Sequence, residues 1–175
     1  MLEEHAKIMA VLQSAGEITG RKKLQKMIFI AKKLNFPFHE KYDFHFFGPY
    51  SEELTLKMEE LTNLGLVIER EKKGNGYVQY CYTLSEEGER FLTHYNVTTP
   101  ELQRCVQMMN EESARFLELV STMLFFEQFD KDKIVEKISV VKEKQHYSKR
   151  EFDDGFQFIE ALKECATRFH SDLNS

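Results

Sequence analysis

The sequence predicts a mainly α protein with a small antiparallel β-sheet, in which an N-terminal domain carries a β-hairpin and a helical extension follows. Two observations support this fold class. Apolar residues recur at spacings of three and four along most of the chain, which is typical of helices packed on a core. Two β-rich segments flank the glycine-containing turn 72–76, which is typical of an antiparallel hairpin.

The composition bounds the class of protein. With 175 residues and a mass of 20.7 kDa, the chain suits one domain, or one small domain with an extension. Hydrophobic residues make up 42% of it, which is enough for a packed core. The formal net charge of -5 disfavours a protein whose whole surface binds nucleic acid.

The cysteines and the N-terminus predict a cytoplasmic protein. Cys81, Cys105 and Cys165 are odd in number and widely spaced, as expected of reduced thiols rather than of a disulfide framework. Residues 1–5 lack the basic and then apolar pattern of a signal peptide. Since no apolar run approaches the roughly 18 residues that a membrane span needs, we expect no membrane contact.

The first two helices are predicted by their apolar stripes. Residues 3–14 place Ile8, Val11 and Leu12 on one face. Residues 21–34 form the second helix, whose buried stripe is expected to comprise Leu24, Met27, Ile28, Ala31 and Leu34. The polar face of this helix is expected to carry six cations: Arg21, Lys22, Lys23, Lys26, Lys32 and Lys33.

An aromatic strand is predicted between the second and third helices. Tyr42, Phe44 and Phe46 alternate over residues 42–47, so their side chains are expected to share one half-buried face. The next residues, Gly48-Pro49-Tyr50, predict a sharp turn, because proline fixes its own φ and restricts the residue before it.

The third helix is predicted over residues 51–64, and it is acidic. Ser51 is expected to cap it by accepting a hydrogen bond from a backbone N–H of the first turn. Four glutamates, at 52, 53, 59 and 60, outnumber the lysine at 57 and give the segment a net charge of -3. Because a helix in the DNA major groove lies between phosphates, this charge disfavours DNA reading by the third helix. The buried stripe is expected to comprise Leu54, Met58, Leu61 and Leu64.

The hairpin and a fourth helix complete the first domain. Strands are predicted over 66–71 and 77–84, and Ser85 is expected to cap the helix that follows. Residues 96–100 form the predicted boundary between a domain at 1–96 and a helical domain at 97–175, which would serve dimerisation or partner packing. Within the second domain, helices are expected near 100–112, 114–128, 130–144 and 148–170.

The order helix, helix, helix, two-stranded hairpin and helix resembles the winged-helix variant of helix-turn-helix. The segment Tyr82-Thr83-Leu84-Ser85-Glu86-Glu87-Gly88 is similar to the exit of the wing in many bacterial winged-helix regulators. This resemblance implies a winged-helix-like N-terminal domain. The chain departs from DNA-binding members at residues 35–50, which insert a strand where a short turn would lie.

Two further motifs together resemble one family. They are Lys23-Leu24-Gln25-Lys26-Met27-Ile28-Phe29-Ile30 and Phe46-Phe47-Gly48-Pro49-Tyr50-Ser51-Glu52-Glu53-Leu54, and they resemble the uncharacterised bacterial YwgA family. The same pair resembles, more distantly, the Panacea domain of antitoxin and proteolysis-adaptor proteins. The resemblance covers about residues 20–92, and it implies a winged-helix-like fold without implying a biochemical function.

The segment Phe47, Gly48, Pro49, Tyr50 and Ser51 has two interpretations. It could bind a partner, because glycine permits close backbone approach and tyrosine offers a ring and a hydroxyl group. It could also be a structural elbow between strand and helix, for which glycine and proline supply the geometry.

Basic residues form a second candidate surface. Arg21, Lys22, Lys23 and Lys26 cluster on the second helix, and Lys72 and Lys73 lie at the predicted hairpin tip. These side chains could contact nucleic acid or an acidic partner protein. The alternative is an ordinary solvated face and a soluble hairpin tip.

No motif for catalysis, metal binding or cofactor binding is present: the sequence lacks HExxH, CxxC, GxSxG, a P-loop and GxGxxG. We therefore expect no enzyme, no catalytic residues, no metal and no cofactor. The leading hypothesis is a cytoplasmic, non-enzymatic interaction or regulatory protein that binds a partner protein or forms a homo-oligomer. The alternative is a DNA-binding transcriptional regulator that uses the basic second helix and the wing, with the helical domain as its dimerisation unit.

Overall fold

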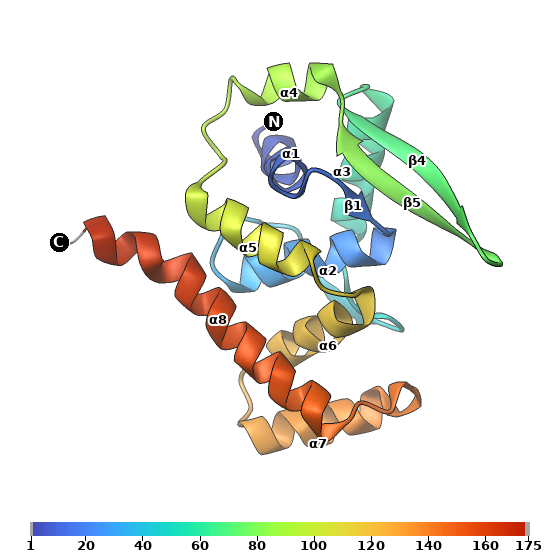
Figure 1. Ribbon diagram of the computed structural model, residues 1–175, viewed down its shortest axis with the longest axis vertical. Coiled ribbons are helices and arrows are strands. Elements are labelled where there is room, and N and C mark those ends of the chain that lie inside the picture. The colour runs from blue at the N-terminus through green and yellow to red at the C-terminus, as the bar shows by residue number, and fades with distance from the viewer. Residues whose placement is uncertain (1, 174–175) are drawn as a thin grey trace.

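The structure, a computed structural model, describes residues 2–173 (Figure 1). The first half contains α1 (Glu3–Ala15), β1 (Ile18–Thr19), α2 (Arg21–Lys33), β2 (Asp43–His45), β3 (Gly48–Tyr50), α3 (Glu52–Asn63), β4 (Val67–Gly74), β5 (Tyr77–Leu84) and α4 (Glu86–Leu92). The second half contains α5 (Pro100–Asn110), α6 (Ala114–Phe125), α7 (Lys131–Val141), a short 3-10 helix η1 (Glu143–Gln145) and α8 (Lys149–Leu173).

The fold class is confirmed as mainly α with small antiparallel sheets. One sheet has the order β1-β5-β4, in which Val67 pairs with Leu84 and Gly74 with Tyr77 at the two ends of the β4-β5 ladder. These two strands form a wing that extends away from the helices (Figure 1). The element order is compatible with a winged-helix-like arrangement of the first half.

The predicted strand over 42–47 is wrong in its extent. The chain reverses at Phe46 and Phe47, so that β2 and β3 form a second, two-stranded sheet with Asp43 opposite Tyr50 and His45 opposite Gly48. The predicted turn 48–50 is therefore itself a strand. Gly48 has a φ of 91°, which glycine adopts without steric cost directly after the reversal. As a result Phe46 leaves the face that it was expected to share with Tyr42 and Phe44.

The predicted caps at Ser51 and Ser85 are confirmed: each side chain accepts a hydrogen bond from a backbone N–H of the first turn, in α3 and α4 respectively. Thr99 and Asp130 cap α5 and α7 in the same way. Leu64 was expected to be buried, but it is the exposed residue that ends α3 before Gly65, whose φ is 73°.

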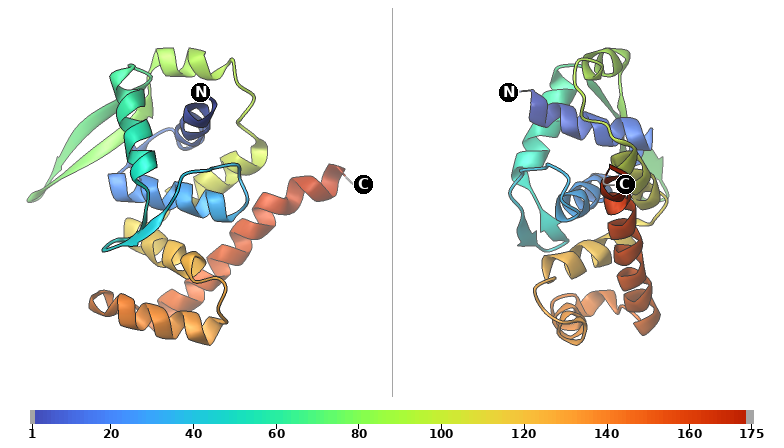
Figure 2. Two further views of the ribbon diagram at one scale, coloured as in Figure 1. Left: turned by 180° about the vertical axis from the view of Figure 1, so that it is seen from behind. Right: turned by 90° about the vertical axis from the view of Figure 1, so that its left-hand side faces the viewer.

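One continuous cluster of buried side chains holds both halves together. It includes Ile8 of α1 and Met27 of α2 together with Met109 of α5 and Leu117 of α6. Helix α8 crosses α5 and α6 on the outside of this core, and α2 lies between α3 and α6 (Figures 1 and 2). The division into domains 1–96 and 97–175 stays a prediction. Among the residues described, every helix is too short or too polar to cross a bilayer.

Candidate functional site

A cluster of buried charges lies beneath the β2-β3 hairpin. The carboxylate of Glu118 on α6 accepts from Lys22 Nζ at 3.0 Å and from Lys142 Nζ at 3.1 Å. Lys142 also donates to the carbonyl oxygen of Phe46 at 2.7 Å, and Lys26 donates to the carbonyl oxygen of Pro49 at 2.7 Å. We call Lys22, Lys26, Glu118 and Lys142 the lysine–glutamate cluster. It connects α2, α6 and the end of α7 to the hairpin, through Phe46 in the turn and Pro49 in β3.

The cluster is unusual because three of its four charges are buried. Lys26 and Glu118 are each 1% exposed and Lys142 is 5% exposed, whereas Lys22 is half-buried. Burying a charge is unfavourable unless hydrogen bonds and opposite charges compensate. Three lysines share one glutamate in this cluster. The carbonyl oxygens of Pro49 and Phe46 therefore act as further acceptors for Lys26 and Lys142. Burial lowers the pKa of Lys26 to about 8; Glu118 opposes this shift, whereas Lys22 and Lys142 add to it.

The hairpin lies directly on this cluster. A Cβ atom at Gly48 would lie 3.4 Å from Thr122 Oγ1, 3.5 Å from Lys26 Nζ and 3.6 Å from Glu118 Cγ. At the far end of β3, Gln25 binds the backbone of Ser51 twice: its Nε2 donates to the carbonyl oxygen, and its Oε1 accepts from the N–H, both at 2.9 Å. The backbone of residues 46–51 is therefore hydrogen-bonded to α2 and to Lys142 at the end of α7, and β3 packs on α6.

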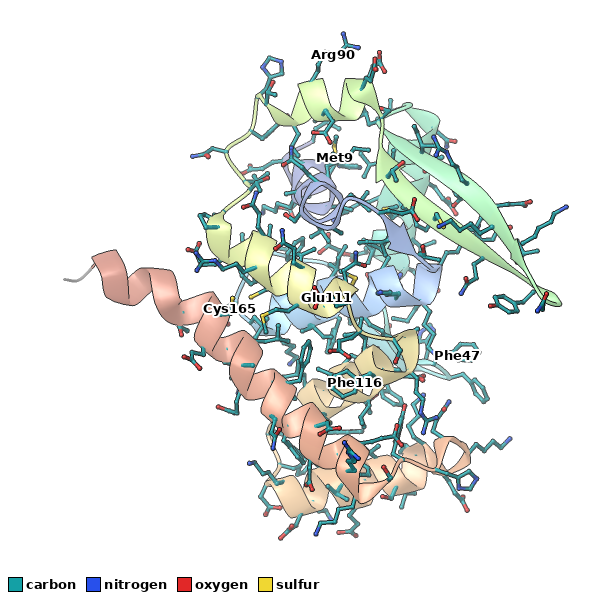
Figure 3. All side chains as sticks on the ribbon, viewed as in Figure 1. Met9, Phe47, Arg90, Glu111, Phe116 and Cys165 are labelled. Carbon is teal, nitrogen blue, oxygen red and sulfur yellow. The ribbon has the colours of Figure 1, made fainter. Side chains whose placement is uncertain are left out.

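This anchored backbone presents two phenylalanines to solvent. The side chains of Phe46 and Phe47 are edge to face, with ring centroids 5.1 Å apart, and the residues are 78% and 56% exposed. Figure 3 shows Phe47 pointing outward from the hairpin. Phe44, by contrast, packs inward on the ring of Phe125 at 5.2 Å between centroids. We call Phe46 and Phe47 the aromatic tip.

A groove of about 770 Å³ adjoins the aromatic tip. Its walls come from the first turns of α2, from the hairpin, from α3 and from the base of the wing. Apolar side chains of Leu54 and Met58 line it beside Tyr50, whose ring stacks on His45 at 4.9 Å. A mixed apolar and polar groove of this size is typical of a binding site.

The five residues that were predicted as a possible partner-binding segment differ in their burial. Phe47 is exposed at the tip and Tyr50 is half-buried in the groove wall, whereas Gly48, Pro49 and Ser51 are buried. The three buried residues fix the hairpin, which fits the structural interpretation. Phe47 and part of Tyr50 are accessible, and partner binding by this segment stays a prediction. Sequence reasoning missed Phe46 as an exposed residue, because strict alternation placed it on one half-buried face with Phe44.

The basic residues of α2 contact other parts of the protein. Arg21 donates to Tyr82 Oη at 3.1 Å, its guanidinium lies 3.9 Å from the centroid of the Tyr80 ring, and it is 3.6 Å from Glu69. Lys23 donates to the carbonyl oxygen of Asn110 at 2.6 Å. The placement of Lys26 on an exposed polar face is wrong, since it is buried in the lysine–glutamate cluster. On the wing, Lys72 pairs with Glu17 at 2.6 Å, and Lys73 is exposed.

The outer face of α3 is acidic and exposed. Glu52, Glu53, Glu59 and Glu60 all lie on the surface, and Leu56 between them is also exposed. Glu60 pairs with His5 at 2.5 Å, while Glu52 and Glu59 have no ion-pair partner among the residues described. Within that same part of the chain, histidine, cysteine and acidic side chains form no group of three that could hold a metal ion.

The fold and this surface define a small, mainly α protein with an exposed aromatic hairpin fixed on a buried charge cluster. No protein-family model matches the chain. It is 54% identical, over 164 residues, to the uncharacterized protein YwgA of Bacillus subtilis (strain 168), covering 94% of this chain and 99% of that relative. The chain therefore belongs to the YwgA family, as its motifs indicated. The more distant resemblance to the Panacea domain stays a prediction.

Proposed function

We propose that this protein is a non-enzymatic interaction protein that binds another polypeptide, either a partner protein or a second copy of itself, through the aromatic tip and the adjoining groove. The observation that carries the proposal is the exposure of Phe46 and Phe47 on a backbone held by buried charges. Surface phenylalanines are common singly, but two in contact at the end of a fixed hairpin form a specific epitope.

Energetic considerations support this proposal. Burial of one phenylalanine side chain contributes about 1.5–3 kcal/mol, and aromatic side chains dominate many protein interfaces. An epitope that is already ordered loses little conformational entropy on binding. The hydrogen bonds from Lys26 and Lys142 to the hairpin carbonyls supply that order before any partner arrives.

The charges near the groove favour a protein partner over DNA. Lys26 is buried, and Lys22 and Lys23 donate to Glu118 and Asn110, so these lysines are poorly placed to release counterions from a phosphate backbone. The exposed glutamates of α3 would repel DNA that approached on that side. The cysteines Cys81, Cys105 and Cys165 are free thiols, which supports a reducing compartment such as the cytoplasm.

Affinity capture with tagged protein tests the proposal. Wild type is compared with Phe46→Ser/Phe47→Ser and with the matched control Tyr77→Ser, which removes an exposed ring from the wing tip. We expect bound polypeptides, including untagged copies of the chain, to be lost with the tip variant and kept with the control. Equal capture by all three proteins would overturn the proposed surface.

A further inference from the structure

We infer that the aromatic tip and groove form a two-fold symmetric interface between two copies of this chain, with the tip of each copy in the groove of the other. This inference rests on the proposed function and names the partner. It follows from the way in which shape and charge are distributed over a single face of the molecule.

The shape of this face is self-complementary. A two-fold interface brings the same patch of both subunits together, so the patch must contain both a projection and a matching recess. Here the projection is the exposed pair Phe46 and Phe47, and the recess is the groove of about 770 Å³ beside it. The hairpin is both the projection and one wall of the groove. The half-buried ring of Tyr50 lines the recess and gives it apolar surface for a phenylalanine ring, whereas Leu54 and Met58 in the same lining are buried.

The charges on the groove walls are also self-complementary. Arg21, from α2, has a side chain that is 61% exposed and uses only part of its five N–H donors on Tyr82 and Glu69. Glu59, on α3, lines another wall, is exposed, and has no ion-pair partner among the residues described. In the proposed interface Arg21 of one copy contacts Glu59 of the other, and the two-fold axis makes this contact twice.

These features distinguish a second copy from an unrelated basic or acidic partner. A groove of one charge would select a partner of the opposite charge, whereas this groove carries both signs: Arg21 lies beside Glu69, and Glu59 is on α3. Two such grooves facing each other by rotation bring each Glu59 a cationic partner from the other copy. The apolar part of the interface is then surrounded by paired charges, which is the usual anatomy of a specific interface.

Sedimentation velocity on the purified full-length protein gives the first test. At low salt, over roughly 1–100 µM, the range expected for interfaces of moderate strength, wild type should shift from monomer to dimer. Phe47→Ser should raise the dissociation constant by about tenfold or more, as loss of an interface hot spot does. The control Tyr77→Ser should leave it unchanged. Dissociation constants that are equal for all three proteins, or a wild type that is monomeric throughout, would overturn the inference.

A charge exchange gives a sharper test of the symmetry. Glu59→Lys and Arg21→Glu should each dimerise poorly alone, because each variant places like charges opposite each other twice. An equimolar mixture should form a heterodimer of near wild-type affinity, because both contacts become attractive. Thermal unfolding and circular dichroism confirm that each variant is folded. If each variant alone dimerises like wild type, or if the mixture fails to associate, the two-fold arrangement is wrong.

The two proposals fail in different ways. If the purified protein stays monomeric while affinity capture yields another polypeptide that depends on Phe46 and Phe47, the proposed function stands and the second copy is excluded. If neither association depends on these phenylalanines, both proposals are excluded.

Discussion

The ammonium group of Lys26 donates to the carbonyl oxygen of Pro49 at 2.7 Å, and this contact attaches the β2-β3 hairpin to the buried face of α2. Because Lys26 is 1% exposed, the contact is made where water does not compete for the carbonyl. A buried lysine is thus used to fix a surface segment, and the exposure of Phe46 and Phe47 follows from where that segment is fixed.

Replacement of Lys26 by methionine should loosen the hairpin more than it destabilises the fold. The change leaves the Pro49 carbonyl without its donor, at a cost of about 1–3 kcal/mol, but it also removes a buried charge whose desolvation is of similar size. We expect little net change in the free energy of unfolding by urea. Amide hydrogen exchange over residues 43–51 should become about tenfold faster or more, consistent with the loss of one such contact. The matched control Lys131→Met alters an exposed lysine, and its hairpin should exchange as in wild type.

The pH dependence of stability should show the lowered pKa of Lys26. In the folded protein this pKa is about 8, below the ordinary value of 10.5, so the unfolded chain binds more protons between these two values. The contribution of Lys26 to the free energy of unfolding should therefore rise with pH across that window and be flat below it. The rise should be absent in Lys26→Met. Identical pH profiles for the two proteins would contradict the assignment.

Removal of the charge of Glu118 should be far more damaging than removal of a surface carboxylate. Glu118→Gln leaves Lys142 buried and without its counter-charge, for which a loss of about 3–5 kcal/mol is typical. Glu87→Gln breaks an exposed pair with Arg90 and should cost less than about 1 kcal/mol. Urea unfolding of the two variants measures the difference. Losses of similar size would show that the buried cluster has no special role.

A methyl group at Gly48 should destabilise the hairpin through backbone strain. Gly48 has a φ of 91°, and Gly76 at the wing tip has a φ of 83°, so alanine at either position is strained by about 1–2 kcal/mol. At Gly48 the methyl group would lie at ordinary van der Waals distance from Thr122 and the Lys26 ammonium, and at Gly76 no atom lies within 4 Å. Chemical denaturation should therefore show losses of similar size for Gly48→Ala and Gly76→Ala. A much larger loss for Gly48→Ala would mean that the hairpin lies closer to α6 than these distances.

The sequence predicted most elements because their signals are local. The caps at Ser51, Ser85, Thr99 and Asp130 act over three residues, and the apolar stripe of α2 repeats within a few turns. The YwgA family was likewise found from two short motifs, and the 54% identity to the Bacillus subtilis protein confirms it.

The candidate site was predicted only in part because its contacts are distant in the chain. Lys22 meets Glu118, and Phe46 meets Lys142, each across 96 residues. No local pattern indicates such partners, so the sequence predicted Lys26 as a surface cation and Phe46 as a residue of a half-buried strand face. The exposure of Phe46 and Phe47 could therefore be recognised only from the structure, in which α6 and the end of α7 lie beneath the hairpin.

Photo-crosslinking in cells that produce the protein tests the central claim most directly. A benzophenone side chain is placed at position 47 in the aromatic tip or, as a control, at position 77 on the wing tip, both of which are exposed. We predict that position 47 gives a discrete polypeptide crosslink and that position 77 gives none. Crosslinks from position 77 alone, or from both positions with equal yield, would contradict the assignment of the aromatic tip as the binding surface.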